Sequence, residues 1–444
     1  MKYFGTDGVR AVAGEFPLVQ EFVEKLGYAA GLFAVKNNKN LKKKVLVAED
    51  SRASGPMLMS YLAKGLNAAG FTVVSVGIAP TPAVSCLVQK LGFDFGAVIS
   101  ASHNPAEFNG IKFFDYDGKK MNEKEEEEIE IILDSITTRP SSDGEFIYDE
   151  TLMLDYQNFL VNTVPQNLFK GVKIVLDCAN GATSKIAPRV FEALGADLVV
   201  LANKPNGKNI NDNVGALHTE TMQKEVVLNG AFCGFSFDGD GDRVIASDEK
   251  GRQLDGDHII SASAVELKKA GKLKSGKIVL TIMANLGMIN FLKANGIETI
   301  LTGVGDKYVS EALEKDNLTI GGETSGHIIF NEISPTGDGI LAALQIAASA
   351  LESRKKMSVF HDLWSKYPSV LSAVKVSQKV PLEEIDGFND LTKELEENFK
   401  GKGRIIVRYS GTEPKLRILV EGEDKDLVSS VAFKLETHFK ERVK

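Results

Sequence analysis

The stretch Phe95-Gly-Ala-Val-Ile-Ser-Ala-Ser-His-Asn-Pro105 joins an apolar run to a polar loop, and this junction indicates the fold. The run from Phe95 to Ile99 is typical of a buried strand. The loop after it presents Ser102 beside His103 and Asn104. Open α/β sheets bind ligands at the carboxyl ends of their strands, so a nucleophile is expected at this position. A capping turn is the competing interpretation, because Ser and Asn are common turn residues.

The composition disfavours several classes of protein. Lys and Arg number 52 against 60 Asp and Glu in 444 residues, a net charge of −8, so we expect no nucleic acid as partner. An anionic substrate would have to be bound by locally clustered cations. No apolar run approaches the length of a membrane span, and the first residues carry no apolar signal segment, so we expect a soluble cytoplasmic protein without a membrane partner. The cysteines are far apart and odd in number, which is typical of reduced core residues: Cys86, Cys178 and Cys233.

The pattern of strands and helices recurs with a period of about one domain, which predicts three similar α/β units in a row. Strands of these units are expected at 44–48, 172–177 and 277–282. A different order, strand, helix, strand, strand, helix, follows Ala373 and predicts a small α+β domain. We therefore predict an α/β domain at 1–140, a second at 141–252, a third at 253–367 and the α+β domain at 368–444, with joints near 137–144 and 366–371.

A second polar loop, Phe237-Asp-Gly-Asp-Gly-Asp-Arg243, also follows an apolar strand. Its three aspartates alternate with glycines and can converge on one hard cation, and oxygen ligands suit Mg²⁺. A calcium-binding EF-hand is excluded, because its sixth position requires glycine and here is Arg243. A solvated acidic turn is the alternative, although packing three carboxylates together is costly without a cation. The predicted metal ligands are Asp238, Asp240 and Asp242, with Arg243 directed at a phosphoryl group.

A third loop, Gly321-Gly-Glu-Thr-Ser-Gly-His327, is a weaker signal, because polar glycine-rich turns are common. Glu323 and Ser325 are separated by one residue, so in an extended turn both can face the same way. A carboxylate and a hydroxyl side by side fit two neighbouring sugar hydroxyls, and the flanking glycines allow a ligand to approach closely.

The fourth loop, Arg408-Tyr-Ser-Gly-Thr-Glu-Pro-Lys-Leu-Arg417, lies between two predicted strands of the last domain. It is not a Walker loop, since the Gly-Lys-Ser/Thr of that motif is missing. A plain β-hairpin turn is the alternative, but two arginines at one turn favour a phosphate clamp. Its predicted donors are Arg408, Ser410, Thr412 and Arg417, with the backbone amides near Gly411.

Two shorter signals complete the set. The opening Phe4-Gly-Thr-Asp-Gly-Val-Arg10 places an arginine after a glycine turn, where Arg10 could enter the same site. Lys112 follows Ser102 by ten residues and could reach it as a cation or a proton shuttle. For a lone lysine, a solvated position is the ordinary interpretation.

Together, in order and over the whole chain, these segments resemble the α-D-phosphohexomutase family, and within it the bacterial branch that acts on glucosamine phosphates. The opening Phe4 to Arg10 and the tail Ser410-Gly-Thr-Glu-Pro414 match that branch, which usually has Gly where this chain has Ala11 and Gln where it has Thr324. The resemblance implies three consecutive α/β domains with mixed sheets and a small C-terminal α+β domain around a central cleft. It also implies a monomer or homodimer that binds a sugar phosphate and one Mg²⁺ per subunit.

The resemblance further implies an isomerase that interconverts glucosamine 6-phosphate and glucosamine 1-phosphate through a phosphoserine and a sugar bisphosphate, for UDP-N-acetylglucosamine synthesis. Phosphoglucomutase/phosphomannomutase activity, a metal-dependent serine phosphatase and a non-catalytic sugar-phosphate sensor remain alternatives. By the resemblance, Ser102 is the phosphoserine and a metal ligand with Asp238, Asp240 and Asp242; Glu323 and Ser325 contact the sugar; Arg408, Ser410, Gly411, Thr412 and Arg417 hold the other phosphate; and Arg10, His103, Lys112, Arg243 and His327 surround the reacting centre.

Overall fold

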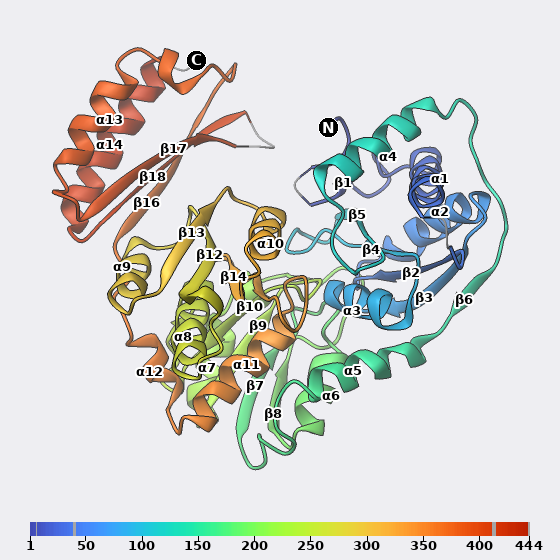
Figure 1. The fold of residues 1–444 in the computed structure, drawn as a ribbon, viewed down its shortest axis with the longest axis horizontal. Helices are drawn as coiled ribbons and strands as arrows, with labels where there is room; N and C mark the ends of the chain where they lie inside the picture. Colours follow the sequence, from blue (N-terminus) through green and yellow to red (C-terminus); the bar gives the residue numbers. More distant parts are fainter. Residues whose placement is uncertain (6, 39–40, 411–413, 443–444) are drawn as a thin grey trace. The chain divides into compact units, whose positions relative to one another are not determined.

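The computed structural model describes residues 1–444 except residues 6, 39–40, 411–413 and 443–444. Its strands form four sheets, each built from one continuous part of the chain (Figure 1). The first three sheets mix parallel and antiparallel neighbours, and the fourth is antiparallel. The predicted fold class, three α/β domains followed by a small α+β domain, is therefore confirmed.

The first sheet has six strands in the order β1-β5-β4-β2-β3-β6. Every residue of β4 is buried, as the apolar run predicted, and helices cover both faces, with α1, α2 and α4 on one side and α3 on the other (Figure 1). An Asn122–Glu125 capping box begins α4. The elements are β1 (Val9–Val12), α1 (Gln20–Asn37), β2 (Lys44–Glu49), α2 (Gly55–Ala68), β3 (Thr72–Ile78), α3 (Thr81–Leu91), β4 (Phe95–Ile99), β5 (Phe108–Phe114), α4 (Glu123–Ser135) and β6 (Phe146–Tyr148).

The pairing of three strands in this sheet brings distant residues to one edge. In β1 and β5, Arg10 is opposite Gly110, and in β4 and β5, Val98 is opposite Lys112. Because β4 lies directly beside β5, the loop that carries Ser102 emerges next to the strand that carries Lys112.

The second and third sheets repeat the alternation of strand and helix. Their strand orders are β11-β10-β9-β7-β8 and β13-β12-β14-β15. The second comprises α5 (Met153–Val161), β7 (Lys173–Asp177), α6 (Ile186–Ala193), β8 (Asp197–Leu201), α7 (Glu220–Leu228), β9 (Cys233–Phe237), β10 (Val244–Ser247) and β11 (Gln253–Leu254). The third comprises α8 (Gly256–Lys269), β12 (Lys277–Thr281), α9 (Leu286–Ala294), β13 (Glu298–Thr302), α10 (Asp306–Lys315), β14 (Ile320–Gly322), β15 (Ile328–Phe330), α11 (Gly339–Glu352) and α12 (Met357–His361).

The last sheet has three strands in the order β16-β18-β17, and its buried face packs against α13 and α14 around Leu416, Ile418 and Leu435. The joint predicted at 366–371 overlaps a strand, because β16 begins at Ser369. The elements are β16 (Ser369–Lys375), α13 (Phe388–Glu397), β17 (Gly403–Tyr409), β18 (Lys415–Gly422) and α14 (Lys425–Arg442).

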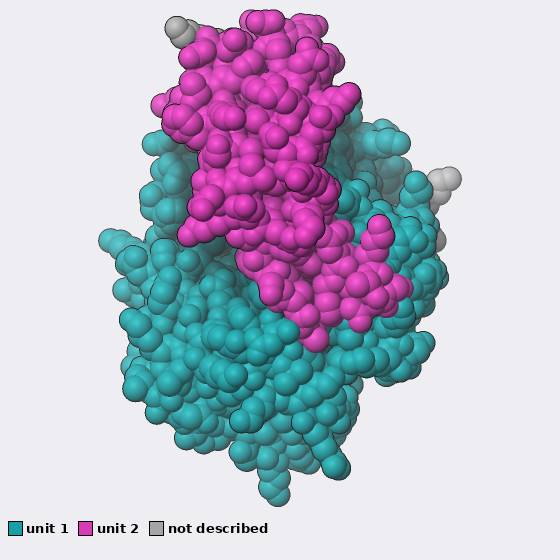
Figure 2. All heavy atoms as spheres, turned by 90° about the vertical axis from the view of Figure 1, so that its left-hand side faces the viewer, with its two compact units in different colours: residues 1–283, 297–362 teal, residues 284–296, 363–444 magenta. Residues whose placement is uncertain are grey.

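The chain divides into two compact units, residues 1–283 with 297–362 and residues 284–296 with 363–444, which Figure 2 distinguishes by colour. The second unit thus contains α9 together with the last sheet. Within the described residues, no helix is both long enough and apolar enough to cross a membrane. The four domain boundaries given above remain a prediction.

Candidate active site

The loop after β4 holds Ser102 in a buried position. The backbone of Ser102 adopts a left-handed conformation, with φ of 51°, which is uncommon for a residue other than glycine. Its hydroxyl donates a hydrogen bond of 2.8 Å to Oδ2 of Asp238 and lies 3.3 Å from Nδ1 of His103. The strand-end position therefore brings the predicted nucleophile to the predicted metal loop.

The loop after β9 gathers three buried carboxylates. Each offers one oxygen, and these oxygens lie within 4.8 Å of one another: Asp238, Asp240 and Asp242. Among the described residues, Oδ1 of Asp240 and Oδ1 of Asp242 have no hydrogen-bond partner although both are buried. Buried acceptors without a donor are costly, and a hard divalent cation would satisfy them. The donor set fits Mg²⁺.

The remaining oxygens of this cluster are fixed by protein donors. Oδ2 of Asp240 accepts 2.7 Å from Nζ of Lys112 and 2.6 Å from the hydroxyl of Thr81. Nδ1 of His327 lies 3.5 Å from Oδ2 of Asp242. Two of the three carboxylates are thus oriented on one side and open on the other, as ligands supported by outer hydrogen bonds are.

The charges of the cluster are unequal. Burial, together with the Asp242 and Asp240 carboxylates, raises the pKa of Asp238 well above its ordinary value, which a bound cation would oppose. Burial and the neighbouring Arg243 and Arg10 lower the pKa of His103 to about 4, so its imidazole is neutral at neutral pH. For His327, burial acts against the imidazolium, but the hydrogen bond to Asp242 prevails and raises the pKa.

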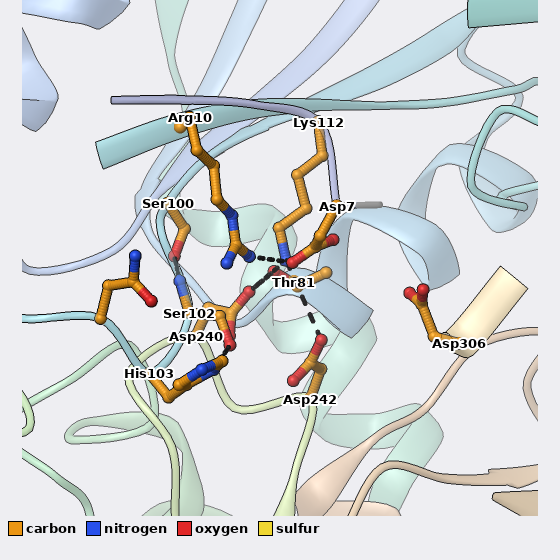
Figure 3. Close-up of polar contacts among 12 residues, drawn as sticks. Asp7, Arg10, Thr81, Ser100, Ser102, His103, Lys112, Asp240, Asp242 and Asp306 are labelled. Atoms are coloured by element: carbon orange, nitrogen blue, oxygen red, sulfur yellow. Dashed lines mark hydrogen bonds and ion pairs between the residues drawn. The ribbon is translucent and has the colours of Figure 1, made fainter. Parts of the chain in front are cut away.

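Cations enter the site from two directions. Arg10 and Lys112 approach from the first sheet and meet Asp7, while Asp240 and Asp242 lie opposite them (Figure 3). Nη1 of Arg243, from the metal loop, is 3.0 Å from Nδ1 of His103. Clustered guanidinium and ammonium groups suit a phosphoryl group.

Three charged residues of this region were not among the predicted site residues. Nζ of Lys120 lies 2.5 Å from Oδ1 of Asp7 and 3.0 Å from Oδ2 of Asp306. A cavity of about 620 Å³ borders Lys120, Asp306 and His327, which is a volume that accommodates a small ligand. Asp7 was visible in the opening glycine turn, whereas Lys120 and Asp306 are 186 residues apart in sequence and carried no local signal.

The third loop begins within β14, whose last two residues are Gly321 and Gly322. The hydroxyl of Ser325 is 3.5 Å from Oε2 of Glu323, so the two side chains face the same way, as predicted. Oε1 of Glu323 accepts 3.2 Å from the backbone amide of Gly305. The hydroxyl of Thr324 donates 2.8 Å to Asp257 in α8, which leaves Glu323 and Ser325 as the polar pair of this turn.

The predicted phosphate clamp lies in the second compact unit. Arg408 in β17 and Arg417 in β18 are direct cross-strand partners. Burial and the nearby Arg417 lower the pKa of Arg408, as expected for two adjacent cations. Ser410 is buried at the end of β17, and Gly411 and Thr412 lie outside the described residues. The clamp assignment stays a prediction.

The family models and the curated relatives that match this chain indicate the same family. Models of the phosphoglucomutase/phosphomannomutase domains match in order: alpha/beta/alpha domain I at residues 1–140, domain II at 155–251, domain III at 255–367 and the C-terminal domain at 371–437. The phosphoglucosamine mutase of Acetivibrio thermocellus is 44% identical, covering 100% of this chain and 99% of the relative. That of Aliarcobacter butzleri is 43% identical and covers 99% of each.

Two solved structures share the fold over nearly the full length. A phosphoglucomutase/phosphomannomutase family protein from Burkholderia thailandensis has a TM-score of 0.80 at 22% identity, covering 99% of this chain and 97% of that one. The N-acetylphosphoglucosamine mutase of Aspergillus fumigatus, in complex with GlcNAc-6P and magnesium, has a TM-score of 0.66 at 19% identity, covering 100% and 96%. From the relatives above 40% identity and the four domain matches, the chain belongs to the phosphoglucosamine mutase family of the phosphoglucomutase/phosphomannomutase proteins.

Proposed function

We propose that this chain interconverts glucosamine 6-phosphate and glucosamine 1-phosphate through a phosphorylated Ser102 and a sugar bisphosphate. Its family makes it an isomerase, and the proposal concerns how its own residues perform the reaction. The observation that carries it is the buried hydroxyl of Ser102, 2.8 Å from a carboxylate of a three-aspartate cluster.

The reaction requires two phosphoryl transfers. In the first, the Oγ–P bond of phospho-Ser102 breaks and a bond forms between phosphorus and the free hydroxyl of the sugar monophosphate, whose proton ends on Oγ of Ser102. The resulting bisphosphate turns around. In the second transfer, the bond between its other phosphorus and the sugar oxygen breaks, and that phosphorus bonds to Oγ of Ser102, whose proton ends on the released sugar oxygen. Such transfers depend on positioning and charge neutralisation more than on new covalent chemistry.

The roles of the remaining residues follow from this scheme. Asp238, Asp240 and Asp242 would hold Mg²⁺, which supplies positive charge beside the transferred phosphoryl group. Glu323 and Ser325 would bind sugar hydroxyls. The other residues bring cations or hydrogen-bond donors to the phosphoryl groups: Arg10, His103, Lys112, Arg243 and His327 at the reacting centre, and Arg408, Ser410, Gly411, Thr412 and Arg417 at the other phosphate.

A coupled assay tests the substrate assignment. Glucosamine 6-phosphate and glucose 6-phosphate differ at one substituent, which is worth about 1–3 kcal/mol, so a slower reaction with the glucose phosphate is expected. A preference for glucose or mannose phosphate would make the chain a phosphoglucomutase or phosphomannomutase. Release of inorganic phosphate in place of an isomer would identify a phosphatase.

A further inference from the structure

Arg52 lies immediately behind the Ser102 loop and has no part in the scheme above. It follows β2, and its side chain is fully buried. A buried guanidinium is costly unless its charge is paired and its donors are used. Asp50 supplies the charge partner, because Oδ2 of Asp50 accepts 2.8 Å from Nε of Arg52.

All five N–H donors of the Arg52 side chain are engaged, four of them with the segment from Ser102 to Phe108, the first residue of β5. Nη2 donates to the carbonyl oxygens of Ser102 at 2.9 Å and Asn104 at 2.8 Å. Nη1 donates to the carbonyl oxygens of Phe108, at 2.9 Å, and Pro105. A guanidinium carries five donors in a rigid plane, so its position fixes the carbonyl oxygens that it binds.

Two further contacts hold the backbone of Ser102. Its amide donates 2.9 Å to the hydroxyl of Ser100, which itself donates 2.6 Å to Asp50. On the other side, Nδ2 of Asn211 donates to the carbonyl oxygens of Ser102, at 2.9 Å, and Asn104, at 3.2 Å. The amide and the carbonyl of Ser102 are therefore both tied to one network.

The conformation of Ser102 explains why such a network is needed. A left-handed backbone at a non-glycine residue is strained and persists only where its surroundings over-determine it. Without the donors on its carbonyl oxygen, the loop would relax toward an ordinary backbone region and move Oγ of Ser102 away from Asp238.

We propose that Arg52 is a positioning residue for phosphoryl transfer, which it supports by holding the carbonyl oxygens of the Ser102 loop, with Asn211 as its partner in the same role. The inference rests on the proposed function of Ser102. Misplacement of a reacting atom by about 1 Å can cost roughly 100-fold in rate, so loss of this network lowers the transfer rate without removing any group that contacts the sugar.

Arg52→Lys tests the inference. Lysine keeps the charge beside Asp50 but has only three N–H donors in a tetrahedral arrangement, so it cannot serve four carbonyl oxygens. We expect kcat to fall about 100-fold and KM to stay within about threefold. The rate of phosphate loss from phosphorylated enzyme after mixing with sugar phosphate, followed by rapid quench and intact mass, should fall by the same factor.

Two variants accompany it. Asn211→Ala removes two donors to the same carbonyl oxygens from a partly exposed side chain, so it remains informative if Arg52→Lys does not fold. It should show a smaller fall in kcat with the same unchanged KM. Arg252→Lys is the matched control, because Arg252 binds Asp248, Asp362 and the carbonyl of Ser358, all outside the site, and its kcat should equal that of wild type.

The outcomes separate the two proposals. Wild-type turnover tests the proposed function, and all ratios are measured with whichever sugar phosphate the wild type accepts. The network would be merely structural if Arg52→Lys had a lower thermal midpoint but unchanged kcat and an unchanged phosphate-transfer rate. If Arg52→Lys does not fold, the same result in Asn211→Ala would lead to that conclusion. A raised KM at constant kcat would equally overturn the inference.

Discussion

At the scale of single residues, Asp7 is the carboxylate around which three cations of the site gather. One carboxylate serves three cations: it pairs with Arg10 and lies 3.2 Å from Nζ of Lys112 and 2.5 Å from Nζ of Lys120. Removing its charge leaves these cations facing one another in a mostly buried region, which is costly and displaces them.

Asp7→Asn should therefore lower kcat by at least about tenfold, because Arg10 loses the ion pair that holds it beside the transferred phosphoryl group, whereas Lys112 keeps Asp240. Steady-state kinetics measures this. Asp134→Asn is the control, since its pair with Lys2 is exposed on both sides and contributes little. Equal kcat for wild type and Asp7→Asn would show that the cations are positioned without Asp7.

Glu49 gives a pH-dependent prediction at the same scale. Burial, with the neighbouring Asp50, raises its pKa from 4.5 to about 7, and its Oε2 has no hydrogen-bond partner among the described residues. The folded state therefore binds a proton more tightly than the unfolded state. The stability that this group contributes is full below about pH 4.5 and is lost as the pH rises through about 7.

The Glu49→Gln variant has no titrating group at this position, so its thermal midpoint should equal that of wild type near pH 5. Near pH 8 the midpoint of the variant should be higher. The corresponding gain in unfolding free energy is about 1–2 kcal/mol, after allowance for the partial exposure of the side chain. Thermal unfolding across this pH range is the measurement, with Glu127→Gln at an exposed position of α4 as control. A difference that shrinks toward pH 8 would contradict the assignment.

The rule that ligands bind at the carboxyl ends of strands predicted the reacting residues but not the residues that hold them in place. Ser102 and the three aspartates follow apolar runs directly, so local sequence marks them. Asp306, at the start of α10, meets Lys120 of the first domain across 186 residues, and Arg52 reaches across 50 residues to the Ser102 carbonyl. Single arginines and lysines are usually solvated, so no pattern in one sequence distinguishes these.

At the scale of elements, the loop Phe237–Arg243 with its three aspartates allows a separate test of metal binding. Burial and the neighbouring carboxylates of Asp242 and Asp240 disfavour the charged form of Asp238, as its raised pKa indicates. Asp238→Asn should therefore leave the metal-free protein at least as stable as wild type. Mg²⁺ stabilises whichever state binds it, so it should raise the thermal midpoint of wild type and have little effect on the variant. Chelation should also abolish activity, restorable by Mg²⁺.

Thermal shifts with and without Mg²⁺ measure this directly. Equal Mg²⁺ shifts in both proteins, or normal turnover in the presence of a chelator, would give the three aspartates another purpose.

Apolar runs located the strands that the sequence predicted. The strands predicted at 44–48, 95–99, 172–177 and 277–282 correspond to β2, β4, β7 and β12. Helix α10 carries no such apolar run, because its buried positions Val309 and Leu313 are separated by charged residues. Strand β14 ends in two glycines, which have low strand propensity, so an apolar run does not mark its end.

At the scale of the whole molecule, the compact unit that contains the last sheet is built from two separate segments of the chain, 284–296 and 363–444. Helix α9 belongs to the same compact unit, and Glu421 of β18 accepts 2.6 Å from Nδ2 of Asn285 and 3.0 Å from the backbone amide of Leu286. The sequence indicated a self-contained tail because strand patterns reveal sheets, whereas the docking of a helix from an earlier segment depends on tertiary contacts.

A fragment ending at Ser365 should therefore fold only with α9 frayed, because the acceptor for Asn285 and for the first turn of α9 is gone. Limited proteolysis should cut within 284–296 in the fragment and not in the full chain. Equal protection of α9 in both would show that it is held by the remainder of the third domain alone.

The most direct test of the mechanism follows the phosphate on Ser102. Enzyme phosphorylated at this residue is mixed with glucosamine 6-phosphate, and intact mass is recorded across a single turnover and at steady state, with Ser102→Ala alongside. The expected result is loss of the phosphate to the sugar and its return with product, while Ser102→Ala stays folded but does not turn over. Full turnover by enzyme that never carries phosphate on Ser102 would contradict the mechanism.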